Sequence, residues 1–134
     1  MEWNIEYIES GNYIKITPEG VFSITDHPKI FQKLLSAPFW KPGMNLFFDN
    51  RNFDFSQMNR DKLRMGSSYY QKVSEHLGNG KVALLMKTTL SYGFGRQFQL
   101  LLEDKVQTEI RVFTNEKEAT DWLAGAPAFQ KINN

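Results

Sequence analysis

The segment Gly93–Arg96, Gly-Phe-Gly-Arg, contains the residue types of a phosphate-binding turn. It follows an apolar run, Val82–Met86, and precedes a second one. Glycine lets a backbone approach a ligand closely, and arginine pairs with anions. However, the third glycine of a dinucleotide-binding fingerprint and the lysine of a P-loop are both absent. Phe94 also falls in helical phase with Phe98 and Leu101, which places the segment inside a helix.

Two functions of the glycine pair remain open. In the first turn of a helix, Gly93 and Gly95 would allow another backbone or a ligand to approach closely, and packing is the favoured interpretation. The alternative is an anion site formed by Arg96 and the helix N-terminus. Aromatic residues with small neighbours could also line a pocket. The candidate pocket or anion-site residues are Tyr69, Tyr92, Gly93, Gly95 and Arg96.

The other reactive side chains do not form a catalytic set. His27 and His76 lie at the start of one predicted helix and the end of another, without the third or fourth ligand of a metal site, so solvated or cap-forming histidines are expected. Ser67–Ser68 fall within a helix, and no G-x-S-x-G elbow exists. The pair Glu103–Asp104 fits an ordinary polar face. We therefore predict that the protein is not an enzyme and binds no metal or cofactor.

Composition sets the class of protein. The chain has 134 residues, 41% of them hydrophobic, which is enough for one domain with its own core. Without cysteine it has no disulfide or thiolate chemistry, which is compatible with the cytoplasm. The opening residues do not form a signal peptide, and no apolar run is long enough to span a membrane. The net charge of +1 argues against nucleic acid as a partner.

A hairpin and then alternating helices and strands should build the fold. Trp3–Tyr7 and Tyr13–Ile16 predict two strands, with Gly11–Asn12 at their turn, and Pro18–Gly20 should end the second strand. The run Lys81–Lys87 is apolar on both faces, which is typical of a central parallel strand. A helix around 30–35, capped by Thr25 or Asp26, and a strand at 44–49 should follow the hairpin. The next predicted helix is opened by Ser56 and ended by Gly78, and its apolar face consists of Met58, Met65, Tyr69, Val73 and Leu77. After Lys81–Lys87 we predict a helix with a stripe of Phe94, Phe98, Leu101 and Leu102, a strand at 106–113, and a last helix capped by Asn115 with Glu118.

The resulting order is β-β-α-β-α-β-α-β-α. It predicts a single α/β domain with a mixed, mostly parallel five-stranded sheet and four major helices. We assign residues 1–124 to this domain and residues 125–134 to a loose C-terminal tail, from which Phe129 could dock.

Several stretches resemble the STAS domain, the fold of bacterial anti-sigma-factor antagonists. The similarity is closest to its uncharacterised STAS/SEC14-like branch and covers most of the chain. It implies the fold more strongly than any function. The residues that carry it are Asp49, Lys81–Leu84, Phe98, Phe113, Ala119, Trp122 and Leu123.

The resemblance also implies a candidate phosphorylation site. In the antagonists, a serine in an Asp-Ser-Ser-Gly-like turn at a helix start is phosphorylated. Ser56 occupies the corresponding turn, Asp54–Met58, but the glycine and the paired serine are missing. The alternative is that Ser56 is only the N-cap of the long helix, and this is the favoured interpretation.

Two classes of function follow. The first is a non-catalytic regulatory or protein-interaction module, because STAS-like domains bind partner proteins. The second is a carrier or sensor of an apolar small molecule or lipid, because the SEC14-like relatives enclose lipid. Either one could act as a homodimer, for which Trp3, Phe39 and Trp40 are the interface candidates. The alternative for Trp40 is that it folds back onto its own domain.

Overall fold

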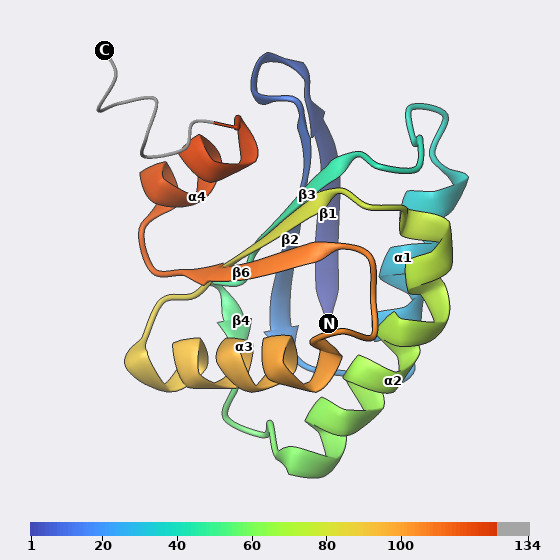
Figure 1. Ribbon diagram of the computed structural model, residues 1–134. Coiled ribbons are helices and arrows are strands. Elements are labelled where there is room, and N and C mark those ends of the chain that lie inside the picture. Colours follow the sequence, from blue (N-terminus) through green and yellow to red (C-terminus); the bar gives the residue numbers. More distant parts are fainter. Residues whose placement is uncertain (126–134) are drawn as a thin grey trace.

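The computed structural model describes residues 1–125, which form a mixed sheet with helices on both sides (Figure 1). The chain begins with a hairpin and then alternates between helix and strand, as predicted. The tail beyond residue 125, including Phe129, lies outside the described residues. The elements in chain order are β1 (Glu2–Ile8), a 3₁₀ turn η1 (Glu9–Gly11), β2 (Tyr13–Val21), α1 (His27–Ser36), β3 (Asn45–Asp49), β4 (Phe53–Asp54), α2 (Arg60–Leu77), β5 (Lys81–Leu85), α3 (Thr89–Leu102), β6 (Glu109–Phe113) and α4 (Glu116–Leu123).

The strands follow the order β1-β2-β3-β5-β6. β1 pairs antiparallel with β2, and every other neighbouring pair on this path is parallel. β5 therefore lies between two parallel neighbours. Its residues from Val82 to Leu85 are buried, as predicted for a central parallel strand. The five predicted strands and the mixed, mostly parallel sheet are confirmed. The two-residue strand β4, which pairs with the end of β2, was not predicted.

Pro18 does not end the second strand, contrary to the prediction. β2 continues to Val21, and Pro18 lies opposite Trp3 in the antiparallel ladder with β1. On the other side of β2, pairing with β3 stops at Ile16 and pairing with β4 begins at Gly20. Pro18 falls in the gap between these two partners, so its missing N–H costs no hydrogen bond there.

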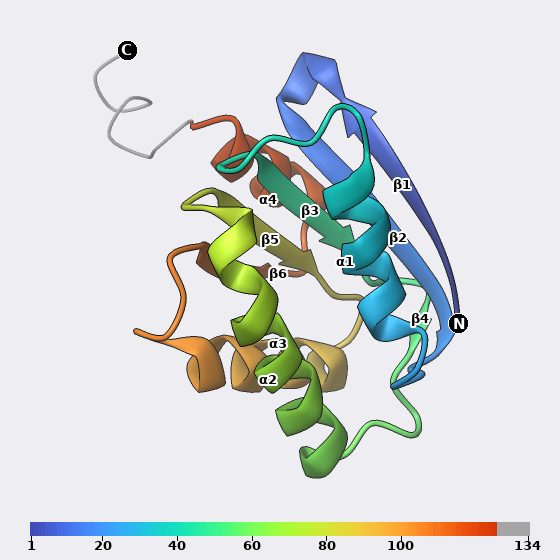
Figure 2. The ribbon, with the colours of Figure 1, turned by 90° about the vertical axis from the view of Figure 1, so that its right-hand side faces the viewer.

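The two faces of the sheet have separate cores. Leu46, Phe48, Val82 and Leu84 pack with α1, α2 and α3, whereas the alternate residues, including Phe47, pack with α4. This division follows from the alternation of side chains along a strand. In Figure 2, α1 and α2 lie together in front of the sheet, and α4 lies behind the strands.

The long helix begins later than predicted. Asn59 is the N-cap of α2, and its side chain accepts a hydrogen bond from the Lys62 backbone N–H at 2.9 Å. Ser56 lies in the preceding turn and is not the cap. The predicted end is confirmed, because Gly78 has φ +80°, a conformation that favours glycine.

The buried face of α2 is also rotated from the predicted one. Met65 is half exposed, and Met58 precedes the helix. The predicted face was defined by the large apolar residues of the segment. In the structure, small and hydroxyl residues fill much of the contact with the sheet and α3. The buried residues of α2 are Leu63, Gly66, Ser67, Tyr70, Ser74 and Leu77.

Candidate functional site

An apolar pocket lies at the carboxyl ends of the parallel strands. Its floor is formed by Phe48 of β3 and Leu84 of β5, together with Met86 just beyond β5. The first halves of α1 and α2 and the middle of α3 contribute its walls. The carboxyl edge of a parallel sheet is where open α/β proteins commonly bind ligands. The cavity has a volume of about 100 Å³.

Aromatic rings surround this pocket. Starting from α3, each ring contacts the next at a centroid distance between 4.8 Å and 6.3 Å. We call this set the aromatic belt. Its members, in order of contact, are Phe94, Phe55, Phe53, Phe22, His27, Phe31, Tyr70 and Phe98.

The belt begins and ends on α3, because Phe94 and Phe98 are four residues apart in that helix. Its other members come from β4 and the segments after β2 and β4, and from α1 and α2. Segments distant in the sequence therefore converge on one site.

His27 is the polar ring within the belt. It lies between Phe22 and Phe31 and also contacts Tyr69 at a centroid distance of 6.1 Å. Burial lowers the pKa of His27 from 6.5 to about 4, so the imidazole is neutral at pH 7. The prediction of a solvated or cap-forming histidine is wrong for His27, because α1 directs it into the pocket. It holds for His76, whose side chain is 63% exposed.

Several other polar groups of the wall have partners. The hydroxyl of Tyr70 shares a hydrogen bond of 2.6 Å with that of Thr108, and burial raises the pKa of Tyr70 to about 12. Asn50 Nδ2 contacts the sulfur of Met86 at 3.8 Å. Lys62 Nζ donates to the Gln57 carbonyl at 2.9 Å. Within residues 1–125, the nitrogens of the His27 ring make no hydrogen bond.

Only one of the five candidate pocket or anion-site residues predicted from the sequence lines the pocket. Gly95 lines the pocket, and a Cβ there would lie 2.8 Å from a methyl of Val112, so close packing requires glycine. Tyr69 stands behind the belt, where its hydroxyl donates to the Pro28 carbonyl at 3.3 Å.

The other three candidates on α3 lie away from the pocket. Tyr92 packs against the core, Gly93 has no atom within 4 Å of where a Cβ would be, and Arg96 is exposed and bonds Gln99. Both glycines lie past the first turn of α3, because the helix begins at Thr89 behind a capping box formed by Thr88 and Ser91. The segment is helical, as the phase of Phe94 indicated.

The turn at Ser56 is exposed. The Ser56 backbone N–H donates to the Asp54 carboxylate at 2.8 Å, and hydrogen bonding from Ser56 lowers the pKa of Asp54. A phosphate on Ser56 would therefore lie beside a carboxylate, and like-charge repulsion would oppose it.

The three interface candidates pack against their own domain. Trp3, Phe39 and Trp40 are each partly buried against the larger core, and Phe39 stacks on Tyr7 at a centroid distance of 5.8 Å. Trp40 thus folds back onto its own chain, the alternative left open by the sequence.

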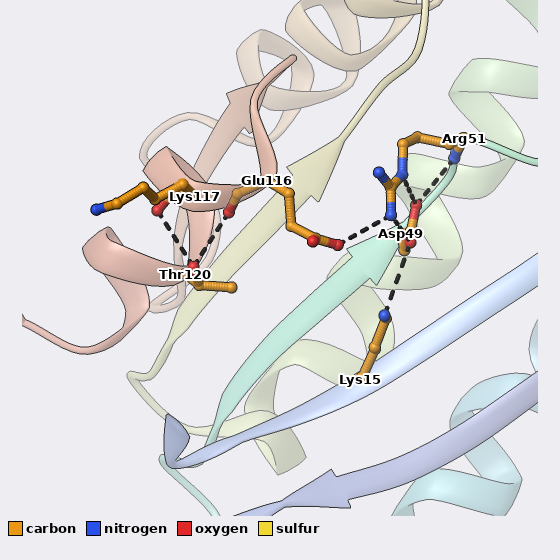
Figure 3. A network of polar contacts seen from close by, with 6 residues as sticks. All are labelled: Lys15, Asp49, Arg51, Glu116, Lys117 and Thr120. Carbon is orange, nitrogen blue, oxygen red and sulfur yellow. Dashed lines mark hydrogen bonds and ion pairs between the residues drawn. The ribbon is translucent and has the colours of Figure 1, made fainter. Parts of the chain in front are cut away.

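A cluster of charges at the end of β3 fixes the loop that leads to the belt (Figure 3). Asp49 is buried and accepts hydrogen bonds from Arg51 Nε at 2.9 Å and from its terminal nitrogen at 2.8 Å. Arg51 also reaches Glu116 of α4 at 2.9 Å, and Lys15 lies 3.9 Å from Asp49. Burial alone would raise the pKa of Asp49, but the bonds from Arg51 outweigh it and keep the pKa low. Asp49 is therefore a structural anion.

The described residues hold neither a metal-binding group of three or more His, Cys, Asp or Glu side chains nor a helix long and apolar enough to cross a membrane.

None of the eight belt residues was among the five candidate pocket or anion-site residues, and Phe22, Phe53 and Phe55 were assigned to no predicted helix or strand. Phe53 and Phe55 carry a weak signal, the alternation in "NFDFS", but the strand it marks is only two residues long. Phe22 follows a strand that the prediction ended too early. These rings converge only through tertiary contacts, which no local pattern reports.

The fold places the chain in a known structural class. It is a SpoIIAA-like, that is STAS-like, α/β fold, as the sequence resemblance predicted. A similar solved structure is that of an uncharacterised protein of the DUF3478 family from Shewanella loihica PV-4 with a SpoIIAA-like fold. The similarity has a TM-score of 0.62 at 18% identity and covers 91% of this chain and 92% of the other. No family model matches this chain, and no curated protein does so.

Proposed function

We propose that this protein is a non-catalytic, STAS-like binding module that holds a small apolar molecule inside the aromatic belt. The observation that carries the proposal is the chain of eight contacting rings around a cavity at the carboxyl edge of the sheet. Ligand sites are typically concave, largely apolar and lined by aromatic side chains with few polar groups.

The size of the cavity limits what it can hold. Its volume of about 100 Å³ is of the same order as an engineered cavity of about 150 Å³ that binds benzene. A ligand of one ring fits this space, whereas a two-chain lipid does not. The proposal therefore keeps the small-molecule function expected from the SEC14-like resemblance and replaces the lipid by a smaller molecule.

The chemistry of the wall supports a binding role over catalysis. Within residues 1–125 no carboxylate lines the pocket, and the hydroxyl of Tyr70 is engaged by Thr108. His27 is neutral and has no acidic partner in the described part of the chain, so the wall formed by these residues lacks the paired acid and base that proton transfer requires.

Benzyl alcohol titrated into ¹⁵N-labelled protein tests the proposal. The amide signals of Gly66 and Gly95, which line the pocket, should shift saturably. Gly66→Leu fills the space and should abolish the shift at Gly95. Gly93→Leu is the matched control, because that position is open to solvent, and it should bind like the parent. An unperturbed spectrum of the parent, or unchanged binding by Gly66→Leu, would contradict the proposal.

Regulation through a protein partner is the other function that the STAS-like fold suggests. The large apolar side chains most exposed within residues 1–125 are spread over β1, the segment after β2, α2 and α3, and none defines a partner. Native mass spectrometry of the purified protein separates the two functions. A co-purified small molecule supports the binding module, and a ligand-free dimer supports an interaction module.

A further inference from the structure

The charge of the pocket wall restricts the ligand further than its shape does. In the described part of the chain, Lys62 is the only charged side chain that lines the pocket. The other basic residue of the wall, His27, is uncharged at pH 7 because burial lowers its pKa to about 4. Among residues 1–125, the side chains that line the pocket therefore offer a bound molecule one positive charge and no negative one.

Lys62 is placed to reach a ligand from the rim. It lies in the first turn of α2, four residues before Gly66 on the same face, and it is partly buried. Its ammonium donates to the carbonyl of Gln57 in an exposed hydrogen bond of 2.9 Å. An ammonium has three N–H donors, so two remain for a ligand, and within residues 1–125 no carboxylate pairs with it.

The rings restrict the other end of the ligand. Phe53 and Phe55 are tilted against each other at 4.8 Å, and Tyr70 meets Phe98 edge to face at 5.6 Å. Aromatic pairs prefer such offset and edge-to-face arrangements. A planar ring can therefore continue the contacts of the belt in a way that a flexible acyl chain cannot.

We propose that the ligand is a single-ring aromatic carboxylate, with its ring inside the aromatic belt and its carboxylate at the ammonium of Lys62. This inference rests on the proposed function, since it names the class of molecule that the same pocket binds. The carboxylate forms charge-assisted hydrogen bonds with Lys62 at the solvent-accessible rim, where it stays partly hydrated. The ring is buried, and no charge enters the apolar interior.

Four probes separate the parts of this inference: benzoate, benzyl alcohol, benzylammonium and hexanoate. Affinities are measured from the Gly66 and Gly95 amide shifts at low ionic strength. Benzoate should bind about tenfold more tightly than benzyl alcohol, the gain expected of a hydrogen bond to a charged group. Benzylammonium and hexanoate should bind more weakly than benzoate, because the first meets a like charge and the second lacks the ring.

Variants of Lys62 assign the preference to its ammonium. Lys62→Met should bring benzoate and benzyl alcohol within about twofold of each other, and Lys62→Arg should keep the preference. Lys72→Met is the matched control, because Lys72 is exposed on the same helix and does not line the pocket. Thermal unfolding checks that each variant is folded.

The failures of the two proposals are distinguishable. Equal binding of benzoate and benzyl alcohol to the parent, or an undiminished preference in Lys62→Met, overturns the carboxylate inference and leaves the binding module intact. Hexanoate binding as tightly as benzoate overturns the aromatic part. If no ring-containing probe shifts Gly66 or Gly95, the proposed function itself fails.

Discussion

Gly66 of α2 faces the imidazole of His27 on α1: a Cβ at Gly66 would lie 4.0 Å from His27 Cε1. This is an ordinary van der Waals distance, so a Cβ at position 66 would not clash with His27. The absence of a side chain there leaves open space inside the belt. At Gly95 a Cβ would lie within 2.9 Å of both Val112 and Met86. One glycine thus shapes the pocket, and the other allows α3 to pack on the sheet.

Alanine at these glycines should have opposite effects on stability. Gly66→Ala should raise the free energy of unfolding by roughly 0.5–1 kcal/mol, the cost of glycine within a helix. Gly93→Ala, on the open side of α3, should do the same and serves as the control. Gly95→Ala should lower it by about 1–3 kcal/mol through overpacking. Urea unfolding measures all three, and stabilisation by Gly95→Ala would contradict the packing described.

The N-terminus of α2 gives a second pair of substitutions. Asn59→Ala should lower the free energy of unfolding by about 1 kcal/mol, because its side chain caps the helix. Ser56→Ala should change it by less than about 0.5 kcal/mol, as expected of an exposed side chain that is not a cap. A larger loss in Ser56→Ala than in Asn59→Ala would restore the cap predicted from the sequence.

These two caps show how far the sequence determines the fold. The apolar run at 82–86 and the cap at Asn115 were predicted correctly, because each depends on neighbouring residues in the chain. Ser56 and Asn59 are both good caps, and local chemistry does not distinguish them. In the structure, β4 pairs with the end of β2 and is followed by a turn in which the Met58 N–H donates to the Phe55 carbonyl, and the helix begins after Asn59.

The pocket also depends on contacts that the local sequence does not predict. Gly95 was recognised as a position of close approach, but His27 was expected to be solvated or to form a cap. Its burial results from α1 packing beside α2 and from Phe22 beyond the end of β2, contacts that join residues distant in the sequence.

The Asp49 cluster predicts the effect of removing Arg51. Arg51→Met removes both side-chain hydrogen bonds to the buried carboxylate of Asp49 and leaves it the backbone N–H of residue 51, at 3.2 Å, and Lys15, at 3.9 Å, so the free energy of unfolding at pH 7 should fall by about 1–3 kcal/mol. Glu116→Gln removes only the exposed ion pair with Arg51 and should cost less than about 1 kcal/mol. Chemical unfolding compares the two, and equal losses would show that Asp49 does not depend on Arg51.

Homodimerisation stays a prediction and now has one remaining basis. Phe39 and Trp40 pack on their own domain, whereas β1 is an edge of the sheet that has no further strand among residues 1–125. An unprotected edge favours pairing with a second copy. We therefore expect a dimer through β1, which light scattering at micromolar concentration detects. A mass of one chain that does not change on concentration removes the dimer.

The partly buried imidazole of His27 should make stability depend on pH in a defined window. The folded pKa of about 4 lies below the unfolded value of 6.5. Between these values the unfolded chain binds a proton that the folded chain excludes. The free energy of unfolding should therefore fall as the pH falls from about 6.5 to 4, by roughly 3 kcal/mol at most. Asp26, Asp49 and Asp54, whose pKa values are lowered from 3.8, add to the loss mainly below about pH 5, so the part of the window above that pH reports on His27.

Two substitutions assign this slope to His27. His27→Phe keeps a ring in the belt and removes the titration, so its stability should be nearly constant between about pH 6.5 and 5. His76→Gln removes the exposed histidine and should retain the slope of the parent. Urea unfolding at intervals of pH measures each curve. A parent whose stability is flat across the window, or a slope that persists in His27→Phe, would show that His27 is not the group that loses its proton on folding.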